Sequence, residues 1–288
     1  MDKDTLRNKI YSKIDELPAL PGTVTRLISL FEDKNSNIAL ITEVIQKEPS
    51  LTAKILRVAN SAYYGFSQKI SDMDRSVALL GFNMVKSLAV SIGVIKSLPS
   101  GNKNPISGSE LWRHSVTVAI LMGEMGKYFF DKKQIDSIFI TGLLHDIGIV
   151  VFDQFFSDRF NEVLDRVTLA GRKELHKIEQ EVIGSDHGEV GGMLLARWNF
   201  PSIISLPVAK HHQLLLEDSG NSKETALLKL ADIISHYDIL KDENIGELEE
   251  ELNPLLKCLG VEQDFVFEAS RFKDSAKDEI TAFFNSII

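Results

Sequence analysis

Cysteine and basic charge are both scarce in this sequence. Cys258 stands alone among 288 residues, so an internal disulfide framework is excluded and a reducing compartment is favoured. Lysine and arginine number 32 against 41 aspartates and glutamates, which gives a net charge of -9. This balance excludes a general electrostatic attraction to nucleic acid or anionic membrane, and leaves room only for a small basic patch.

Long apolar runs are also missing. No uninterrupted apolar span reaches the roughly 20 residues that cross a bilayer. The start, Met1-Asp2-Lys3-Asp4, is charged, and no apolar run of the signal-peptide type follows it. We therefore expect a soluble, cytoplasmic protein without membrane contacts.

Sustained period-two alternation, the pattern of half-buried strands, is absent too. Apolar residues recur instead at helical spacing, as with Leu6, Ile10 and Ile14, and 44% hydrophobic residues supply an ample core. We predict an all-α fold, a multi-helix bundle. The expected helices cover residues 6–14, 24–31, 38–45, 49–58, 76–95 (two helices or one kinked at Gly81), 110–128, 134–144, 155–170, 175–183, 188–198, 201–212, 223–236, 247–252 and 264–284.

The clearest change in composition lies at residues 97–105, which are rich in Pro, Ser, Gly and Asn. We place a subdomain boundary there. The predicted division is an N-terminal helical subdomain (1–97), a linker (98–109), a second helical subdomain (110–240) and an acidic helical tail (241–288). The linker is too short for independent diffusion, so the two subdomains should pack together.

Histidine and aspartate gather in the apolar segments. His145 and Asp146 follow the segment Thr141-Gly142-Leu143-Leu144, and burying two ionisable neighbours is costly unless a partner, such as a divalent metal, compensates. Taken alone, such a pair is more typical of a hydrogen bond at a helix end. A metal site is favoured because further candidate ligands lie in apolar segments with helical spacing: His114, His187, His211, His212 and Asp232.

The two adjacent pairs, His145-Asp146 and His211-His212, constrain the geometry. Neighbouring helical side chains diverge by about 100 degrees, so each pair must lie at a helix end or inner edge to reach one cavity. Two such pairs imply a pocket wide enough for more than one ion. If one ion is held by His114, His145, Asp146 and Asp232, a second would be held by His187, His211 and His212, with Asp146 as a bridge. Imidazole and carboxylate ligands without thiolate suit iron, manganese, zinc or nickel.

Several motifs resemble those of HDOD proteins, a bacterial signalling family related to the HD superfamily of metal-dependent phosphohydrolases. The similar stretches together cover about residues 15 to 240, and the Asn60-Ser61 stretch is the most specific of them. They are Leu-Pro-Ala-Leu-Pro (17–21), Glu-Pro-Ser-Leu-Thr-Ala-Lys-Ile-Leu-Arg-Val-Ala-Asn-Ser-Ala-Tyr-Tyr-Gly (48–65), Ser-Val-Ala-Leu-Leu-Gly (76–81), Leu-Trp-Arg-His-Ser (111–115), Gly-Leu-Leu-His-Asp-Ile-Gly (142–148), Asp-His-Gly-Glu-Val-Gly (186–191) and Trp-Asn-Phe-Pro (198–201).

The resemblance implies a metal centre, with iron or manganese as the expected ion. The branch of the superfamily that hydrolyses cyclic di-GMP binds metal through a helix Glu and His, the His-Asp pair, further histidines and a late Asp. By position these fall on Glu110, His114, His145, Asp146, His187, His211, His212 and Asp232. Many HDOD proteins have lost several of these ligands, whereas this chain keeps the set.

Two departures from the hydrolase branch weaken the expectation of catalysis. That branch carries a Lys three residues after the Asp of the pair, and here the position is Ile149. It also follows the histidine pair with a Gly-Tyr-Pro motif, where this chain has residues 213–218, Gln-Leu-Leu-Leu-Glu-Asp. The phosphate of a substrate would lack its usual cation. Arg113, Lys210 and Arg197 are candidate replacements, although ordinary solvated charges are the simpler interpretation.

We therefore expect an HDOD-type regulatory or signalling module that acts through contacts with a partner protein and does not hydrolyse cyclic di-GMP at a useful rate. The alternative is a metal-dependent phosphohydrolase acting on a nucleotide or cyclic dinucleotide, and a nucleotide stays open as a ligand. A third interpretation makes the site purely structural. Asn60-Ser61 is expected to end a helix, and His176 to be solvated on a charged face.

Overall fold

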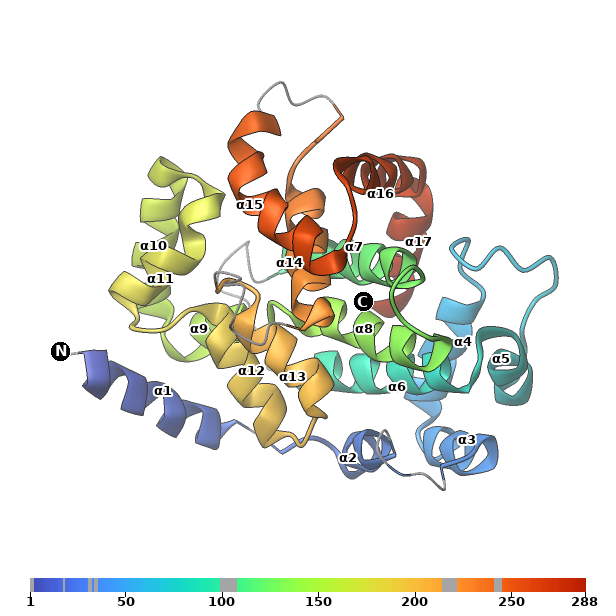
Figure 1. The fold of residues 1–288 in the computed structure, drawn as a ribbon. Helices are drawn as coiled ribbons and strands as arrows, with labels where there is room; N and C mark the ends of the chain where they lie inside the picture. Colours follow the sequence, from blue (N-terminus) through green and yellow to red (C-terminus); the bar gives the residue numbers. More distant parts are fainter. Residues whose placement is uncertain are drawn as a thin grey trace.

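Helices form the regular structure of this computed structural model (Figure 1). The structure describes residues 3–17, 19–30, 33, 36–98, 108–213, 222–240 and 245–288, and these ranges contain no strand. The all-α prediction is confirmed. The helices are α1 Lys3–Glu16, α2 Gly22–Ser29, α3 Ile38–Gln46, α4 Pro49–Ala59, α5 Met73–Leu80, α6 Phe82–Ser97, α7 Ser109–Gly126, α8 Lys132–Leu144, α9 Ile147–Phe155, α10 Ser157–Ala170, α11 Leu175–Val182, α12 His187–Arg197, α13 Ser202–Lys210, α14 Lys223–His236, α15 Ile245–Leu259, α16 Gln263–Ser275 and α17 Lys277–Ile287.

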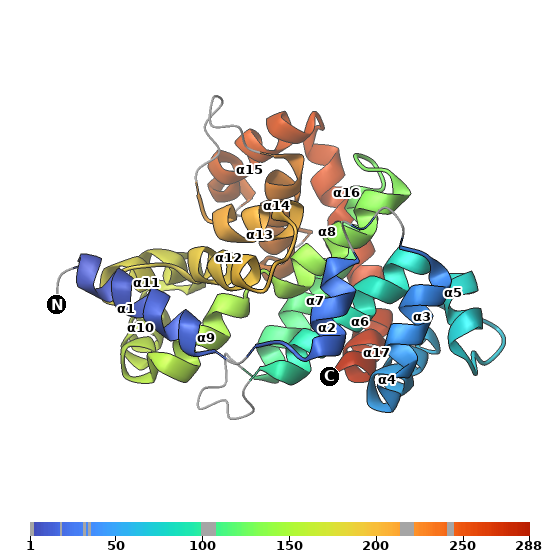
Figure 2. The same ribbon diagram turned by 90° about the horizontal axis from the view of Figure 1, so that it is seen from below.

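One apolar core joins the N-terminal helices to the segment that carries the histidines. Buried residues from α1 to α13 and from α17 belong to it, among them Ile55, Val85 and Phe139. A second core lies around α14, α15 and α16 and includes Leu228, Leu252 and Val266. Figure 2 shows α17 beside the N-terminal helices, and it packs against both α4 and α7.

Gly81 separates α5 from α6. It has φ 92°, a conformation that side chains with a Cβ rarely adopt, and the two helix axes differ in direction by 115°. The sequence left open two helices or one kinked helix over residues 76–95, and the structure has two.

The structure corrects several predicted helix boundaries. Helix α9 was not predicted, because its first seven residues, 147–153, are all buried and include β-branched Ile149, Val150 and Val151, so no amphipathic period marks it. The single helix expected over 264–284 is two helices that meet at Ala276. The helix expected over 247–252 extends across Ile245–Leu259 and contains Pro254.

The segment Gln134–Phe155 is long and apolar enough to be compared with a membrane span, with a mean hydropathy of 1.8. It carries Asp136, Asp146 and Asp153, and 89% of the window is buried inside the protein. The segment is also divided into α8 and α9 by a turn at His145 and Asp146. It therefore forms part of the protein core.

The predicted linker lies mostly outside the described residues, so the proposed division into subdomains stays a prediction. What the structure does describe is close packing across that division. The hydroxyl of Ser87 on α6 donates a hydrogen bond to the carbonyl oxygen of Asp136 on α8 at 3.0 Å. The C-terminal helices contribute to both cores.

Candidate metal centre

Seven of the eight predicted ligands, all except Glu110, come together between α7, α9, α12, α13 and α14. His114 lies on the second turn of α7, and Asp232 lies on α14. His145 and Asp146 form the turn between α8 and α9, His187 begins α12, and His211 and His212 follow the end of α13. Both adjacent pairs thus lie at helix ends, as the geometry of neighbouring side chains requires.

The first group of possible metal ligands consists of His114, His145 and Asp232. One ligand atom from each lies within 4.8 Å of the others. Nε2 of His114 lies 3.1 Å from Nε2 of His145 and 3.1 Å from Oδ1 of Asp232. The His145 side chain is fully buried, and the His114 side chain is 9% exposed.

The second group consists of His187, His211 and His212, again with ligand atoms within 4.8 Å of one another. Nε2 of His187 lies 2.7 Å from Nε2 of His212. The rings of His211 and His212 are tilted against each other with centroids 3.9 Å apart.

Asp146 lies between the two groups. Its Oδ1 is 3.1 Å from Nε2 of His145 in the first group and 3.2 Å from Nε2 of His187 in the second. Its Oδ2 is 3.4 Å from Nε2 of His114, and Nε2 of His211 lies 4.0 Å from Oδ1. The carboxylate therefore contacts both groups, which is the position required of a bridging ligand.

Hydrogen bonds to the far ring nitrogens fix the orientation of the imidazoles. Nδ1 of His145 donates to the carbonyl of Gly142 at 2.8 Å, and Nδ1 of His211 donates to the carbonyl of Val208 at 2.7 Å. Nδ1 of His187 donates to Glu179 at 2.6 Å. Partners of this kind typically set the tautomer of metal-binding histidines, since they leave the lone pair of Nε2 directed inward.

The residues fit a divalent cation. With Nδ1 protonated, the inward Nε2 atoms of neutral imidazoles carry lone pairs, and these face one another and the carboxylates of Asp146 and Asp232. Among the described residues, the buried Nε2 of His211 has no hydrogen-bond partner. A cation at the point where these atoms meet would be a partner for both the imidazole nitrogens and the carboxylate oxygens.

Burial and the carboxylates of Glu179 and Asp146 determine the pKa values of the histidines at the site. Burial lowers the pKa of His145, and burial with the neighbouring His145 and His187 lowers the pKa of His211 to about 4. Both are neutral at pH 7 and available as ligands. Burial opposes a charge on His187 as well, but Glu179 and Asp146 outweigh it and raise its pKa well above the ordinary value. In the absence of a metal, the proton on His187 supplies positive charge between these two carboxylates.

Two glycines allow the ligand-bearing helices to approach closely. A Cβ on Gly148 would lie 2.0 Å from the carbonyl oxygen of His187, so α9 meets α12 through bare backbone. A Cβ on Gly188 would lie 2.9 Å from Cε1 of His211. Side chains at these positions would separate the helices that bring His187 and His211 together.

Glu179 belongs to the site, and sequence reasoning missed it. Its side chain is fully buried on α11, where it accepts a hydrogen bond from Nδ1 of His187. A signal was present, because Glu179 occurs at core-facing spacing with Leu175 and Val182. A glutamate in such a position needs a buried partner.

Two further histidines lie beside the ligand groups. The ring of His176 stacks on that of His212 with centroids 4.5 Å apart and an angle of 1° between the planes. The expectation of a solvated His176 is therefore wrong, because the fold places α11 against the end of α13. His236 lies with its ring centroid 4.3 Å from that of His114, and Nδ1 lies 3.6 Å from Asp232. Glu110 is exposed at the start of α7 and belongs to neither ligand group.

Two of the three basic residues suggested by the sequence contact other parts of the protein. Arg113 stacks over the ring of Phe284, 4.5 Å from its centroid, and Arg197 forms an ion pair with Asp15. Ile149 is fully buried in the core. Lys229 on α14, three residues before Asp232, is a further cation near the cluster. Burial lowers its pKa, and the carboxylates of Glu251 and Asp232 oppose this shift.

Comparisons with known proteins agree with this architecture. A family model described as the HDOD domain matches residues 17–214. An uncharacterized protein from Treponema pallidum is 26% identical over 212 residues, which are 73% of this chain and 40% of that protein. The chain thus spans about two fifths of the length of this curated relative.

Two crystal structures share the fold over nearly their whole length. One is a protein from Shewanella amazonensis, provisionally named a phosphohydrolase, with a TM-score of 0.78 and 21% identity, covering 97% of this chain and 98% of that one. The other is an HDOD domain protein of unknown function from Geobacter sulfurreducens, with a TM-score of 0.76 and 24% identity, covering 99% and 97% of the two chains. At these identities the likeness establishes the fold.

Proposed function

Because the chain belongs to the HDOD domain family and Asp146 contacts both histidine groups, we propose that it is a cytoplasmic signalling module built around a two-ion metal centre. The observation that carries the proposal is the contact of one carboxylate with both histidine groups. Ions bound there would hold together helices that are far apart in sequence. A partner protein would respond to the surface that results.

The donor atoms favour iron or manganese. Imidazole nitrogen and carboxylate oxygen suit both ions, and the one cysteine, Cys258, lies on α15 in the other core. His114, His145 and Asp232 would hold one ion, His187, His211 and His212 the other, and Asp146 both. Bound metal would supply positive charge that stabilises the buried carboxylates and can lower the pKa of a coordinated water.

The route from the centre to the surface runs through packed helices. Helix α7, which carries His114, contacts α8 and α17. Helix α8, which ends at the His145–Asp146 turn, contacts α6. Metal binding would bias the arrangement of α4 to α6 by the difference in metal affinity between two packings, which in ordinary coupling is about 1 to 3 kcal/mol.

Hydrolysis of cyclic di-GMP is not part of the proposal. The position that carries a phosphate-facing Lys in the hydrolase branch is Ile149, which is fully buried. A phosphodiester at the ions would meet no cation from that position, and electrostatic stabilisation of its developing charge would be weaker.

One observation favours the alternative, a metal-dependent phosphohydrolase. Lys229 lies on the same helix as Asp232 and is half-buried at the edge of the cluster, where its ammonium donates to the carbonyl of Gln213 at 3.4 Å. It could contact a phosphate bound at the ions. The Shewanella amazonensis protein of the same fold carries the provisional name of phosphohydrolase.

Metal content and hydrogen exchange on the same preparations test the proposal. Protein purified without chelator should contain about two ions per chain, as dinuclear sites do. Asp146→Asn should lose most of that metal, while Asp158→Asn, an exposed aspartate on α10, should keep it. Removal of the metal should also raise the exchange rate of amides in α4 to α6.

The possible failures are distinct. No metal in the wild-type protein, and no uptake of iron or manganese, would contradict the metal centre. Metal lost without any change in exchange over α4 to α6 would contradict the signalling role. Turnover of cyclic di-GMP on the order of 1 per second or faster, abolished by Lys229→Met, would favour the phosphohydrolase.

A further inference from the structure

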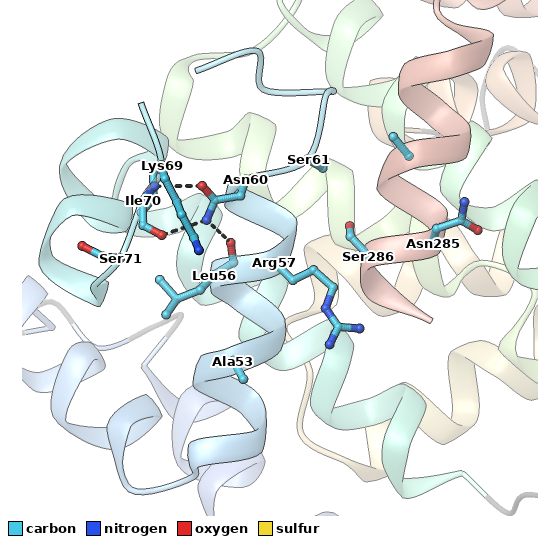
Figure 3. A pocket seen from close by; sticks show the side chains of 11 residues that line it. Ala53, Leu56, Arg57, Asn60, Ser61, Lys69, Ile70, Ser71, Asn285 and Ser286 are labelled. Atoms are coloured by element: carbon cyan, nitrogen blue, oxygen red, sulfur yellow. Dashed lines mark hydrogen bonds between the residues drawn. The ribbon is translucent and has the colours of Figure 1, made fainter. Parts of the chain in front are cut away.

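A groove between α4 and α17 lies apart from the ligand-bearing elements α7, α9, α12, α13 and α14. Its volume is about 820 Å³, within the range of small-molecule sites. The walls are formed by α4, by the loop that follows it and by α17 (Figure 3). The side chains on which the argument rests are Arg57, Asn60, Ser61, Lys69, Ser71 and Asn285.

The groove is basic in a protein whose net charge is -9. Its charged lining residues are Arg57 and Lys69, and the lining includes no carboxylate. Burial lowers the pKa of the neighbouring Lys54, and the positive charges of Lys96 and Arg57 lower it further. Arg57, which lines the groove, is therefore close enough to Lys54 for their positive charges to repel, and an anion beside Arg57 would relieve that repulsion.

Polar groups in the groove also lack partners. Within the described ranges, the guanidinium of Arg57 makes no ion pair, although it extends from α4 into the space facing Asn285 and Ser286 (Figure 3). Oγ of Ser61 is shielded from solvent and has no hydrogen-bond partner among these residues. A hydroxyl in that state is ready to donate to a bound acceptor.

Asn60 fixes the loop that forms one wall. Its Oδ1 accepts a hydrogen bond from the backbone N–H of Ile70 at 2.8 Å, and its Nδ2 donates to the carbonyl of the same residue at 2.8 Å. Lys69 and Ser71 flank Ile70 and are thereby held beside the groove. The Asn60-Ser61 motif thus has two parts: the amide orders the loop, and the hydroxyl lines the groove.

We propose that this groove binds a small phosphorylated molecule with a planar ring, of the nucleoside monophosphate class. The guanidinium of Arg57 matches the oxygens of a phosphate, and Lys69 with the hydroxyls of Ser61 and Ser71 adds further donors. Apolar surface from the accessible side chains of Ala53, Leu56 and Ala282 can cover a ring. A free acidic peptide is less suitable, since the donors gather at one small groove.

Calorimetric titration of the full chain with guanosine monophosphate, on the protein as purified and again after treatment with a metal chelator, tests the inference. Chelation removes metal-dependent binding at the His/Asp cluster. Saturable binding is expected, and guanosine without the phosphate should bind at least about tenfold more weakly because the charge-assisted hydrogen bonds are lost. Equal binding of guanosine, or no binding of the monophosphate, would overturn the proposal.

Variants locate the binding site. The double variant Arg57→Gln/Lys69→Gln should raise the Kd about tenfold or more. The control Lys127→Gln/Arg166→Gln changes the net charge equally at exposed positions on other helices and should leave the Kd unchanged. Asn285→Asp, which places a negative charge at an exposed position of the groove, should also weaken binding. Unchanged affinity in a folded Arg57→Gln/Lys69→Gln or Asn285→Asp protein would overturn the assignment to this groove.

Discussion

Oε2 of Glu179 accepts two hydrogen bonds from a single residue, His187. One comes from the backbone N–H at 2.9 Å and the other from Nδ1 at 2.6 Å. The carboxylate therefore fixes both the start of α12 and the orientation of the imidazole. It also leaves Nε2 of His187 directed at Asp146, 3.2 Å away.

Glu179→Gln should weaken metal binding. The amide keeps a similar shape but removes the negative charge that makes the imidazole more basic, and loss of such a partner typically lowers metal affinity about 10- to 100-fold. Competition with a chromophoric chelator measures the change. Glu181→Gln, whose side chain is 67% exposed on the same helix, is the matched control. Equal affinities in the two variants would show that Glu179 has no influence on the centre.

Gly188→Ala should disturb the second ligand group. Its Cβ would lie 2.9 Å from Cε1 and 3.0 Å from Nδ1 of His211, and it would meet the Val208 carbonyl that orients this ring. Overpacking of this kind costs about 1 to 3 kcal/mol. We expect a lower Tm and the loss of part of the bound metal, both measured on one preparation. Gly22→Ala is the control, since a Cβ there meets nothing within 4 Å. Full metal content in Gly188→Ala would contradict the geometry of this group.

Asn60→Ala should destabilise the protein without touching the metal centre. The variant leaves the N–H and carbonyl of buried Ile70 without the side-chain partner that holds the loop, which costs about 1 to 3 kcal/mol. Urea unfolding measures the loss, and Asn161→Ala, exposed on α10, is the control. Stability equal to that of the control would show that the clamp contributes little.

The metal-free protein should become less stable as the pH falls from 7 to 5. Burial lowers the pKa values of His145, His176, His211, His212 and His236, so the unfolded chain binds more protons than the folded chain over this range. His211 alone, with a pKa of about 4, should lower the unfolding free energy by about 2 kcal/mol at pH 5.

His187 acts in the opposite direction. Its raised pKa contributes stability that is fully present below the unfolded value and is lost as the pH rises through the folded value. The histidines with a lowered pKa outnumber the one with a raised pKa, so the net effect of acidification is a lower Tm. Thermal unfolding at pH 7 and pH 5 in the presence of chelator measures it, and a Tm that rises on acidification would contradict the assignment of neutral histidines.

The sequence by itself determined the helical fold and seven candidate ligands of the two histidine groups and Asp146. Helical spacing of apolar residues is a local property, so amphipathic helices such as α2, α4 and α11 could be predicted from one segment at a time. The adjacent pairs His145-Asp146 and His211-His212 likewise predicted local geometry, because neighbouring side chains in a helix point in different directions. The pairs required helix ends, and the structure places both pairs at helix ends and brings their ligand atoms together.

Only the tertiary structure decided the rest, because burial and contact depend on residues far apart in the chain. The first seven residues of helix α9 are all buried, so no amphipathic period marks it. Glu179 lies at core-facing spacing, but its partner is known only once α12 is placed against it, and His176 resembles a solvated residue until it meets His212. The basic groove lies between α4 and α17, which come together only in the folded protein. Lys54 of α4 donates hydrogen bonds to the backbone oxygens of Ile287 and Ile288 at 2.9 Å and helps to hold α17 in place. This contact spans more than 230 residues, so no local pattern contains it.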